Sequence, residues 1–335
     1  MTSLRRVSVL VLAAMLAAAG CGQDKPKAET GPPASAVAPA SALPQASAPP
    51  PPSARPPASV AAAGPISKVL LIAEENHAYE QIIGAPAAPY LNELARTYGS
   101  ATRMDAGYRA ACPSLAAYIL LTSGSTAGIC DDRTPKAHRL RGDNVFQQVA
   151  ASGRDWRGYA ESAPGPCPLV SSSDGRYLVR HVPATYYIDD RQDCARWVVP
   201  MGDPHHGALH DDAAGGALPA FGFVTPDACH DMHGAAPCPA DGVGNGDRWL
   251  RSWLPSILAG PDYRAGRLAI IITWDEGTST DNHIPTLVIS PTTRHTESDQ
   301  AFTHCSTLRT IEELLRLPLL GCAAGAASMV AAFHL

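Results

Sequence analysis

Two apolar runs, each followed by acidic or amide side chains, are the clearest pattern in the chain. Residues 268–273, LAIIIT, form a continuous apolar and β-branched run that leads into Asp275-Glu276. Residues 69–73, VLLIA, lead in the same way into Glu75-Asn76. Unbroken runs of this length are typical of strands that are buried on both faces of a parallel sheet. Because ligands bind beyond the carboxyl ends of such strands, we expect the two polar pairs to meet in one crevice.

The rest of the pattern alternates between short strands and amphipathic or apolar helices. We expect further strands at 100–104, 156–159, 220–225 and 286–290, and helices at 88–98, 115–123, 144–152, 247–258 and 304–315. This alternation predicts an α/β fold, a three-layer α/β/α sandwich with a mostly parallel central sheet. The Pro- and Gly-rich segments 161–183 and 226–246 are predicted to be long loops, which are usually functional in a compact domain.

The N-terminal segment has the pattern of an export signal. Two arginines, Arg5 and Arg6, precede the apolar run 7–19, and small residues precede Cys21. We interpret residues 1–21 as a lipoprotein-type signal peptide that ends at Cys21, which would anchor the protein in the cell envelope through a lipid. Ordinary cleavage without a lipid, which would release a secreted protein, is the alternative.

A linker and one large domain are expected after the signal. Residues 22–65 consist mainly of Ala, Pro and Ser without apolar periodicity, so they are predicted to be a disordered linker. Residues 66–335 are predicted to form a single catalytic domain. The net charge of −5 and the absence of a basic stripe argue against nucleic acid as a partner. The oligomeric state does not follow from the sequence.

Eight of the nine cysteines lie in this domain, and an even number in an exported chain indicates disulfides. Because each would close a loop between sequence neighbours, we expect four pairs: 112 with 130, 167 with 194, 229 with 238, and 305 with 322. A zinc site is the alternative, but no two cysteines have CxxC spacing.

The clustered carboxylates favour a cation between them, because like charges at one site repel. Oxygen ligands suit Mg²⁺, Ca²⁺ or Mn²⁺ better than Zn²⁺. Ser114 follows Pro113 at the start of the apolar helix 115–123, where backbone N–H groups favour an anion. Either Ser114 only caps this helix, or it faces the cation, which would lower the pKa of its hydroxyl and make it a nucleophile.

Several ordered motifs between Lys68 and Gly321 resemble a bacterial phosphoesterase family that contains acid phosphatases and phospholipases C and is related in fold to alkaline phosphatase. The motifs are Glu75-Asn76-His77-Ala78-Tyr79, Pro89-Tyr90-Leu91-Asn92, Cys112 to Gly124, Arg180-His181-Val182-Pro183, Phe223 to His233, Gly246 to Leu250, Trp274 to Gly277, His283-Ile284-Pro285, and Thr303 to Glu312. The resemblance therefore implies an alkaline phosphatase-like fold.

The resemblance also implies roles for individual residues. It places one divalent cation on Glu75, Asn76, Asp275 and Glu276, and makes Ser114 the nucleophile. It makes His181 and His233 the candidate proton donors, and it places Asp231 and His283 in the phosphate pocket. The chain departs from the family pattern at four positions, which leaves the substrate preference open: Ala116, Ala117, Val182 and His230.

The implied activity is metal-dependent hydrolysis of small-molecule or lipid phosphate esters. We expect an acid phosphatase, a phosphomonoesterase that forms a phosphoserine on Ser114. A phospholipase C-type phosphodiesterase is the alternative enzyme, and a catalytically weakened, lipid-anchored binding protein is the alternative outside catalysis.

Overall fold

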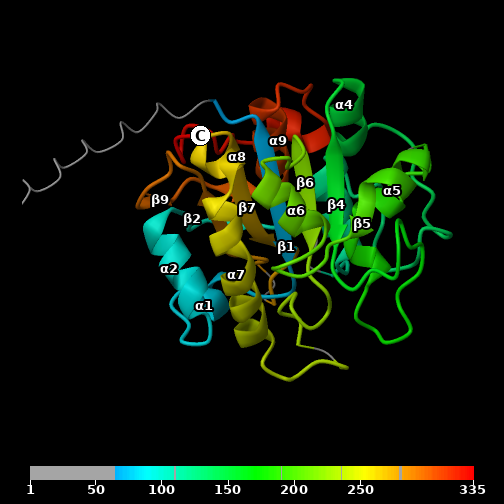
Figure 1. Ribbon diagram of the computed structural model, residues 1–335, viewed down its shortest axis with the longest axis horizontal. Coiled ribbons are helices and arrows are strands. Elements are labelled where there is room, and N and C mark those ends of the chain that lie inside the picture. Colours follow the sequence, from blue (N-terminus) through cyan, green and yellow to red (C-terminus); the bar gives the residue numbers. More distant parts are fainter. Residues whose placement is uncertain (1–64, 109–110, 190, 235, 279–280) are drawn as a thin grey trace, which may run out of the picture. The chain divides into compact units, whose positions relative to one another are not determined.

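The apolar runs of the sequence form the centre of an eight-stranded sheet in the computed structural model, which describes residues 65–335 except 109–110, 190, 235 and 279–280. The predicted signal and the predicted linker up to residue 64 lie outside these residues. The strand order is β5-β4-β6-β1-β7-β8-β2-β9 (Figure 1). The strands are β1 Lys68–Glu74, β2 Gly99–Ala101, β4 Trp156–Ala160, β5 Val198–Pro200, β6 Phe221–Thr225, β7 Leu268–Trp274, β8 Thr286–Ile289 and β9 Thr296–Ser298.

Most of the sheet is parallel, as predicted. The neighbours β5, β4, β6, β1 and β7 all run in the same direction. β8 runs antiparallel to β7 and to β2, and β2 pairs with β9 in parallel. A separate pair of short strands, β3 (Met104–Asp105) and β10 (Phe302–Thr303), lies outside the large sheet.

Helices cover both faces of the sheet, which confirms the three-layer architecture. Alternate side chains of β1 enter different cores: Leu70 and Ile72 join one, and Leu71 joins the other. The first core is closed by α2 (Pro89–Thr97), α6 (Ala208–Gly215), α7 (Gly242–Ala259) and α8 (Pro261–Arg264). The second is closed by α3 (Leu115–Ser123), α4 (Val145–Ala151), α5 (Arg191–Trp197) and α9 (His304–Leu314). In Figure 1, α6 and α7 lie in front of the strands.

The start of α7 lies within the predicted loop 226–246, so that part of the prediction was wrong. The helix begins at Gly242, and the Asp241 side chain accepts a hydrogen bond from the Gly244 N–H at 3.1 Å. A Cβ on Gly246 would come within 2.4 Å of the Met232 side chain. These glycines obscure the helix in the sequence, but they let it pack tightly against the loop that carries Asp231.

Several short elements were also absent from the sequence prediction. The helices α1 (Tyr79–Ile82), α5 and α6 and the 3₁₀ turns η1 (Val179–His181), η2 (Pro183–Thr185) and η3 (Gly321–Gly325) are examples. Most of these have too few residues to show a period, so their positions are set by tertiary contacts.

The four disulfides are those that the sequence predicted, Cys112–Cys130, Cys167–Cys194, Cys229–Cys238 and Cys305–Cys322. Disulfides persist in oxidising compartments, so the pairing indicates an exported protein. Within the described part of the chain, none of the helices has the length and apolar character needed to cross a membrane.

Candidate active site

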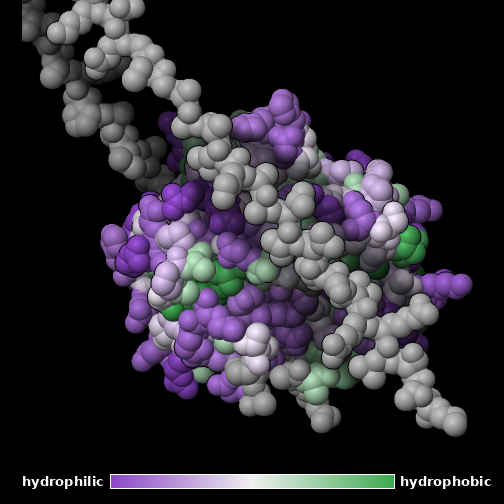
Figure 2. Space-filling view, turned by 90° about the horizontal axis from the view of Figure 1, so that it is seen from below, coloured by the Kyte–Doolittle hydropathy of each residue, from purple (hydrophilic) through white to green (hydrophobic). Residues whose placement is uncertain are grey.

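The ends of β1 and β7 bring Glu75 and Asp275 together, as the strand pattern predicts. The two strands pair in parallel up to Glu74 opposite Trp274, and the Asp275 N–H donates to the Glu74 carbonyl at 2.9 Å. Both Glu75 and Asp275 are fully buried. Figure 2 looks at this edge of the sheet from below the view of Figure 1, and outside the grey atoms the surface is mainly hydrophilic.

Asn76 lies at the centre of the carboxylates. Its φ of 47° turns the chain sharply after the strand, and its N–H donates to Asp275 Oδ1 at 2.9 Å. Its side-chain nitrogen lies 3.3 Å from Glu75 Oε2, 3.3 Å from Asp275 Oδ1 and 3.3 Å from Glu276 Oε1. All four predicted metal ligands are therefore side by side.

Ser114 faces this group. Its hydroxyl donates to Glu75 Oε2 at 2.9 Å and, among the described residues, makes no capping hydrogen bond to α3. The capping contact comes instead from Asp132, whose Oδ1 accepts from the Leu115 N–H at 3.1 Å. The interpretation of Ser114 as only a helix cap was therefore wrong.

Tyr118 is a site residue that the sequence analysis missed. Its hydroxyl donates to Glu75 Oε1 at 2.7 Å, and its ring stacks on that of His181 with centroids 5.1 Å apart. Residues four positions apart share a helix face, so the spacing between Ser114 and Tyr118 was an available signal. His304 lies within the matching motif Thr303 to Glu312, which was assigned no role, whereas Tyr108 had no comparable signal. Tyr108 donates to Glu276 Oε2 at 2.9 Å, and His304 Nε2 lies 2.7 Å from the Asp275 carbonyl.

His181 lies buried between two carboxylates. Its Nε2 is 3.1 Å from Glu75 Oε1, and its Nδ1 is 3.6 Å from Asp231 Oδ2. Burial, together with the nearby Arg180 charge, holds the pKa of His181 well below its usual value, so the ring is neutral. A neutral ring has one N–H, so it can donate to one of the two acids without adding charge.

The loop after β6 carries Asp231 and His233 to the same place. The Asp231 carbonyl accepts from the Glu75 N–H at 2.7 Å, and Asp231 Oδ1 accepts from the His233 N–H at 2.9 Å. The His233 side chain is exposed, so it lies at the rim of the buried group and is open to solvent.

His283 is not brought against the carboxylates. Its contacts within the described chain are with Tyr79, on which it stacks at 4.8 Å, with the Thr102 carbonyl at 2.9 Å from Nε2, and with Glu80 at 3.5 Å from Nδ1. It lines a cavity of about 480 Å³ together with Asp105. The position predicted for the phosphate pocket is therefore in a neighbouring cavity.

The electrostatics of the acids around Asn76 fit a bound cation. Burial raises the pKa of Asp275 to about 6 and those of Glu276 and Asp231 to about 7. Burial and the Asp275 charge raise the pKa of Glu75 well above its usual value. Three buried acids and the half-buried Glu276, which repel one another, are stable as carboxylates only beside positive charge. Their oxygens are the donor set of a hard divalent cation.

Comparisons with known proteins agree with this chemistry. A profile described as the Phosphoesterase family matches residues 85–318. A phosphatidylinositol-3-phosphatase from Mycobacterium tuberculosis is 27% identical over 272 residues, which cover 80% of this chain and 83% of the relative. An acid phosphatase from Aspergillus fumigatus is 30% identical over 120 residues, which cover 34% of this chain and 25% of the relative.

Solved structures show the same fold. A protein in the alkaline phosphatase superfamily from Vibrio parahaemolyticus has a TM-score of 0.50 at 13% identity, covering 76% of this chain and 67% of the other. The lipoteichoic acid synthase LtaP from Listeria monocytogenes has a TM-score of 0.51 at 9% identity, covering 75% and 72%. The chain therefore belongs to the phosphoesterase family, with an alkaline phosphatase-like fold, and is a phosphoric ester hydrolase.

Proposed function

We propose that the chain is a metal-dependent phosphomonoesterase that acts through a phosphoserine on Ser114. The observation that carries this proposal is the hydrogen bond from the Ser114 hydroxyl to Glu75 Oε2 at 2.9 Å. A serine at the start of a helix ordinarily turns its oxygen back to the helix N–H groups. Here Asp132 takes that contact, and Ser114 is left to face the acids.

Glu75, Asn76, Asp275 and Glu276 would hold one divalent cation, of the Mg²⁺, Ca²⁺ or Mn²⁺ type. When bound, such an ion supplies positive charge that lowers the pKa of a neighbouring hydroxyl and balances the charge of a phosphate. The fit rests on the donor chemistry of the site, in which three carboxylates each have an oxygen 3.3 Å from the side-chain amide nitrogen of Asn76.

In the hydrolysis of the phosphate ester, each step is assigned to a residue of the chain. The Ser114 oxygen forms a bond to phosphorus, its proton passes to a neighbouring carboxylate, and the ester P–O bond breaks. We assign protonation of the leaving oxygen to His233, because its side chain is open to solvent whereas His181 is enclosed by Glu75 and Asp231. Water then attacks the phosphoserine and gives one proton to His233, the bond between the Ser114 oxygen and phosphorus breaks to release phosphate, and the carboxylate returns its proton to Ser114.

His181 and Tyr118 act as positioning residues in this scheme. Both contact Glu75 Oε1, at 3.1 Å and 2.7 Å. They keep the second oxygen of Glu75 directed at Ser114. Fixed geometry of this kind supplies much of the rate enhancement in phosphoryl transfer.

The substrate class is a phosphate monoester, and the relative named as a phosphatidylinositol-3-phosphatase favours a lipid monoester among the candidates. A phospholipase C-type diesterase would differ in cleaving a phosphocholine diester faster than a nitrophenyl phosphate. A binding protein would cleave neither. Measuring both substrates with the same preparation separates these functions.

The proposal includes the location of the enzyme at the cell envelope. The four disulfides indicate an exported chain, and we propose that Cys21 is lipidated and holds the enzyme at the cell envelope through the linker that precedes the domain. Mass spectrometry of the mature N-terminus checks the lipid.

The decisive experiment replaces Ser114 with Ala. We expect Ser114→Ala to fold normally, because α3 keeps its Asp132 cap, and to lose on the order of 10³-fold or more of its turnover. The matched control is Ser123→Ala at the other end of α3, where the hydroxyl donates to the Ile119 carbonyl. Acid-quenched wild type should carry phosphate on the Cys112–Cys130 peptide. Near-normal turnover of Ser114→Ala would refute the phosphoserine mechanism.

A further inference from the structure

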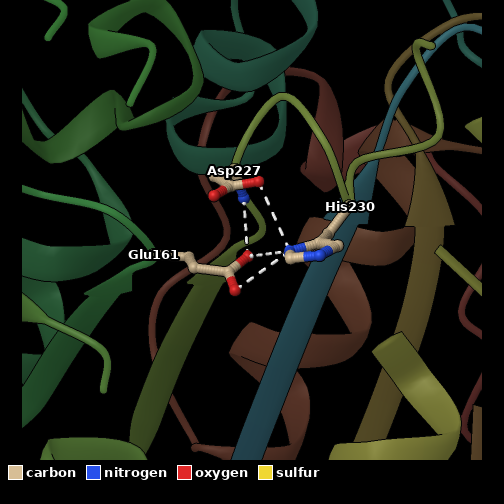
Figure 3. A group of neighbouring side chains, drawn as sticks. All are labelled: Glu161, Asp227 and His230. Atoms are coloured by element: carbon tan, nitrogen blue, oxygen red, sulfur yellow. Dashed lines mark hydrogen bonds and ion pairs between the residues drawn. The ribbon is translucent and has the colours of Figure 1, made fainter. Parts of the chain in front are cut away.

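A second group of metal-ligating side chains lies beyond the neighbouring strands β4 and β6. Glu161 follows β4, and Asp227 and His230 follow β6. His230 Nδ1 lies 3.0 Å from both Glu161 carboxylate oxygens and 3.3 Å from Asp227 Oδ1 (Figure 3). The three potential ligand atoms all lie within 4.8 Å of one another.

We propose that Glu161, Asp227 and His230 form a second divalent-cation site, separate from the group around Glu75. One imidazole with two carboxylates suits Mn²⁺ or Zn²⁺ better than Mg²⁺ or Ca²⁺. Adjacent ligands of a tetrahedral ion at about 2.1 Å are about 3.4 Å apart. The separations of 3.0 Å and 3.3 Å from His230 Nδ1 are close to that spacing.

Asp227 is held with one oxygen directed at this site. Its Oδ2 accepts from Ser162 Oγ at 2.6 Å and pairs with Arg176 Nη2 at 2.6 Å. Its Oδ1 accepts from the Cys229 N–H at 2.9 Å and faces His230. Hydrogen bonds of this kind from outside the ligand set fix the orientation of metal-binding carboxylates.

The buried, unpartnered carboxylate of Glu74 is a second, independent observation that indicates a cation on this face of the sheet. Its side chain is fully buried, and neither carboxylate oxygen has a hydrogen-bond partner among the residues that the structure describes. Because successive side chains of a strand alternate, Glu74 points to the face opposite Glu75, the α7 face on which His230 stacks against Trp249.

The group opens onto a cavity that could admit water or a further ligand. Glu161 and His230 line a hollow of about 320 Å³ with Asp203, Arg248, Trp249 and Trp253. Three protein ligands beside such a hollow leave a coordination position open, which is the arrangement of exchangeable rather than closed metal sites.

A charged His230 paired with Glu161 is the competing account, since carboxylates also raise the pKa of this imidazole. The two accounts differ in metal stoichiometry. The test titrates the chelated full-length protein with Mn²⁺, followed by electron paramagnetic resonance, and counts bound ions by elemental analysis. We expect two ions per chain for wild type and one ion for His230→Asn.

Two further variants keep the test decisive if His230→Asn folds poorly. Glu161→Gln retains an oxygen acceptor for the Asp227 N–H and is also expected to bind one ion. His210→Asn is the matched control, because His210 also lies 2.9 Å from a carboxylate and its side chain has the same 31% exposure as His230, and it should bind two ions.

The proposal is overturned if wild type binds one ion that Asp275→Asn removes, or if His230→Asn and Glu161→Gln both keep the wild-type count. The result differs if the first site, the group around Glu75, binds no ion. In that case Asp275→Asn keeps the wild-type ion while His230→Asn loses it, and the second site stands.

Discussion

Removing a single oxygen atom from Tyr118 tests whether the Glu75 carboxylate needs to be held in place. Tyr118→Phe keeps the ring that stacks on His181 and deletes the hydroxyl that donates to Glu75 Oε1 at 2.7 Å. Burial and the Glu75 charge raise the pKa of Tyr118 well above its usual value, so the hydroxyl keeps its proton and acts as a donor. The substitution therefore removes one hydrogen bond to a buried acid.

The expected magnitude follows from that contact. A hydrogen bond to a charged group contributes about 1.5–3 kcal/mol, and both Tyr118 and Glu75 are fully buried, so we expect unfolding free energy to fall by about this amount. Losing an orienting partner of a metal ligand typically costs about 10–100-fold in metal affinity or activity. We expect kcat/KM for a nitrophenyl phosphate and the affinity for the divalent cation to fall within this range.

Tyr177→Phe is the matched control. Tyr177 is also buried, and its hydroxyl donates to the Pro168 carbonyl at 2.9 Å, away from the acids. It should lose about 1 kcal/mol of stability and keep its activity. If Tyr118→Phe keeps kcat/KM and metal affinity within about twofold of wild type, the hydroxyl only packs the core and the positioning role is refuted.

Two further substitutions probe the metal and the pH response. Asp275→Asn is expected to lower bound divalent metal and turnover together, because it removes a central oxygen ligand, and full activity after exhaustive chelation would contradict the site. Burial raises the pKa of Glu312 from 4.5 to about 8, so the folded state binds a proton that the unfolded state lacks between these values. Stability should therefore fall as pH rises from about 4.5 to 8, by about 1–3 kcal/mol. Glu312→Gln should flatten this slope in thermal unfolding, and an unchanged slope would assign the pH response to other groups.

The sequence predicted that the acids after β1 and β7 meet, because strand ends are local features. Glu75 and Asp275 directly follow apolar runs, and parallel pairing of the two strands brings them to one edge. Ser114 was placed correctly at a helix start, but its partner depends on how α3 lies across the sheet. That packing involves Leu115 and Ile119 in a core shared with five strands, which no periodicity reveals.

The pattern did not determine where other side chains lie. His283 occurs in a matching motif, yet its ring stacks on Tyr79, because the direction of a side chain after β7 depends on the loop that leads into β8. Glu161 is a single acid at the start of a Gly- and Pro-rich loop and meets His230 only through the pairing of β4 with β6. Contacts between loops of adjacent strands require the strand order, which the sequence does not contain.

The strand order also explains how one strand end can serve two sites. Glu74 and Glu75 are neighbours in the chain, so the pleat of β1 sends their side chains to opposite faces of the sheet. Glu75 meets Ser114 under α3, while Glu74 lies on the α7 side with the loops of β4 and β6. Two buried carboxylates one residue apart would repel if both were ionised without compensation. A cation on each face would compensate both charges. Loss of the second ion removes a positive charge that repels the first ion, so the Glu75 site should then bind its ion more tightly. A titration in which His230→Asn raises the affinity of the Glu75 site several-fold would show this coupling, and unchanged affinity would show that the two faces act independently.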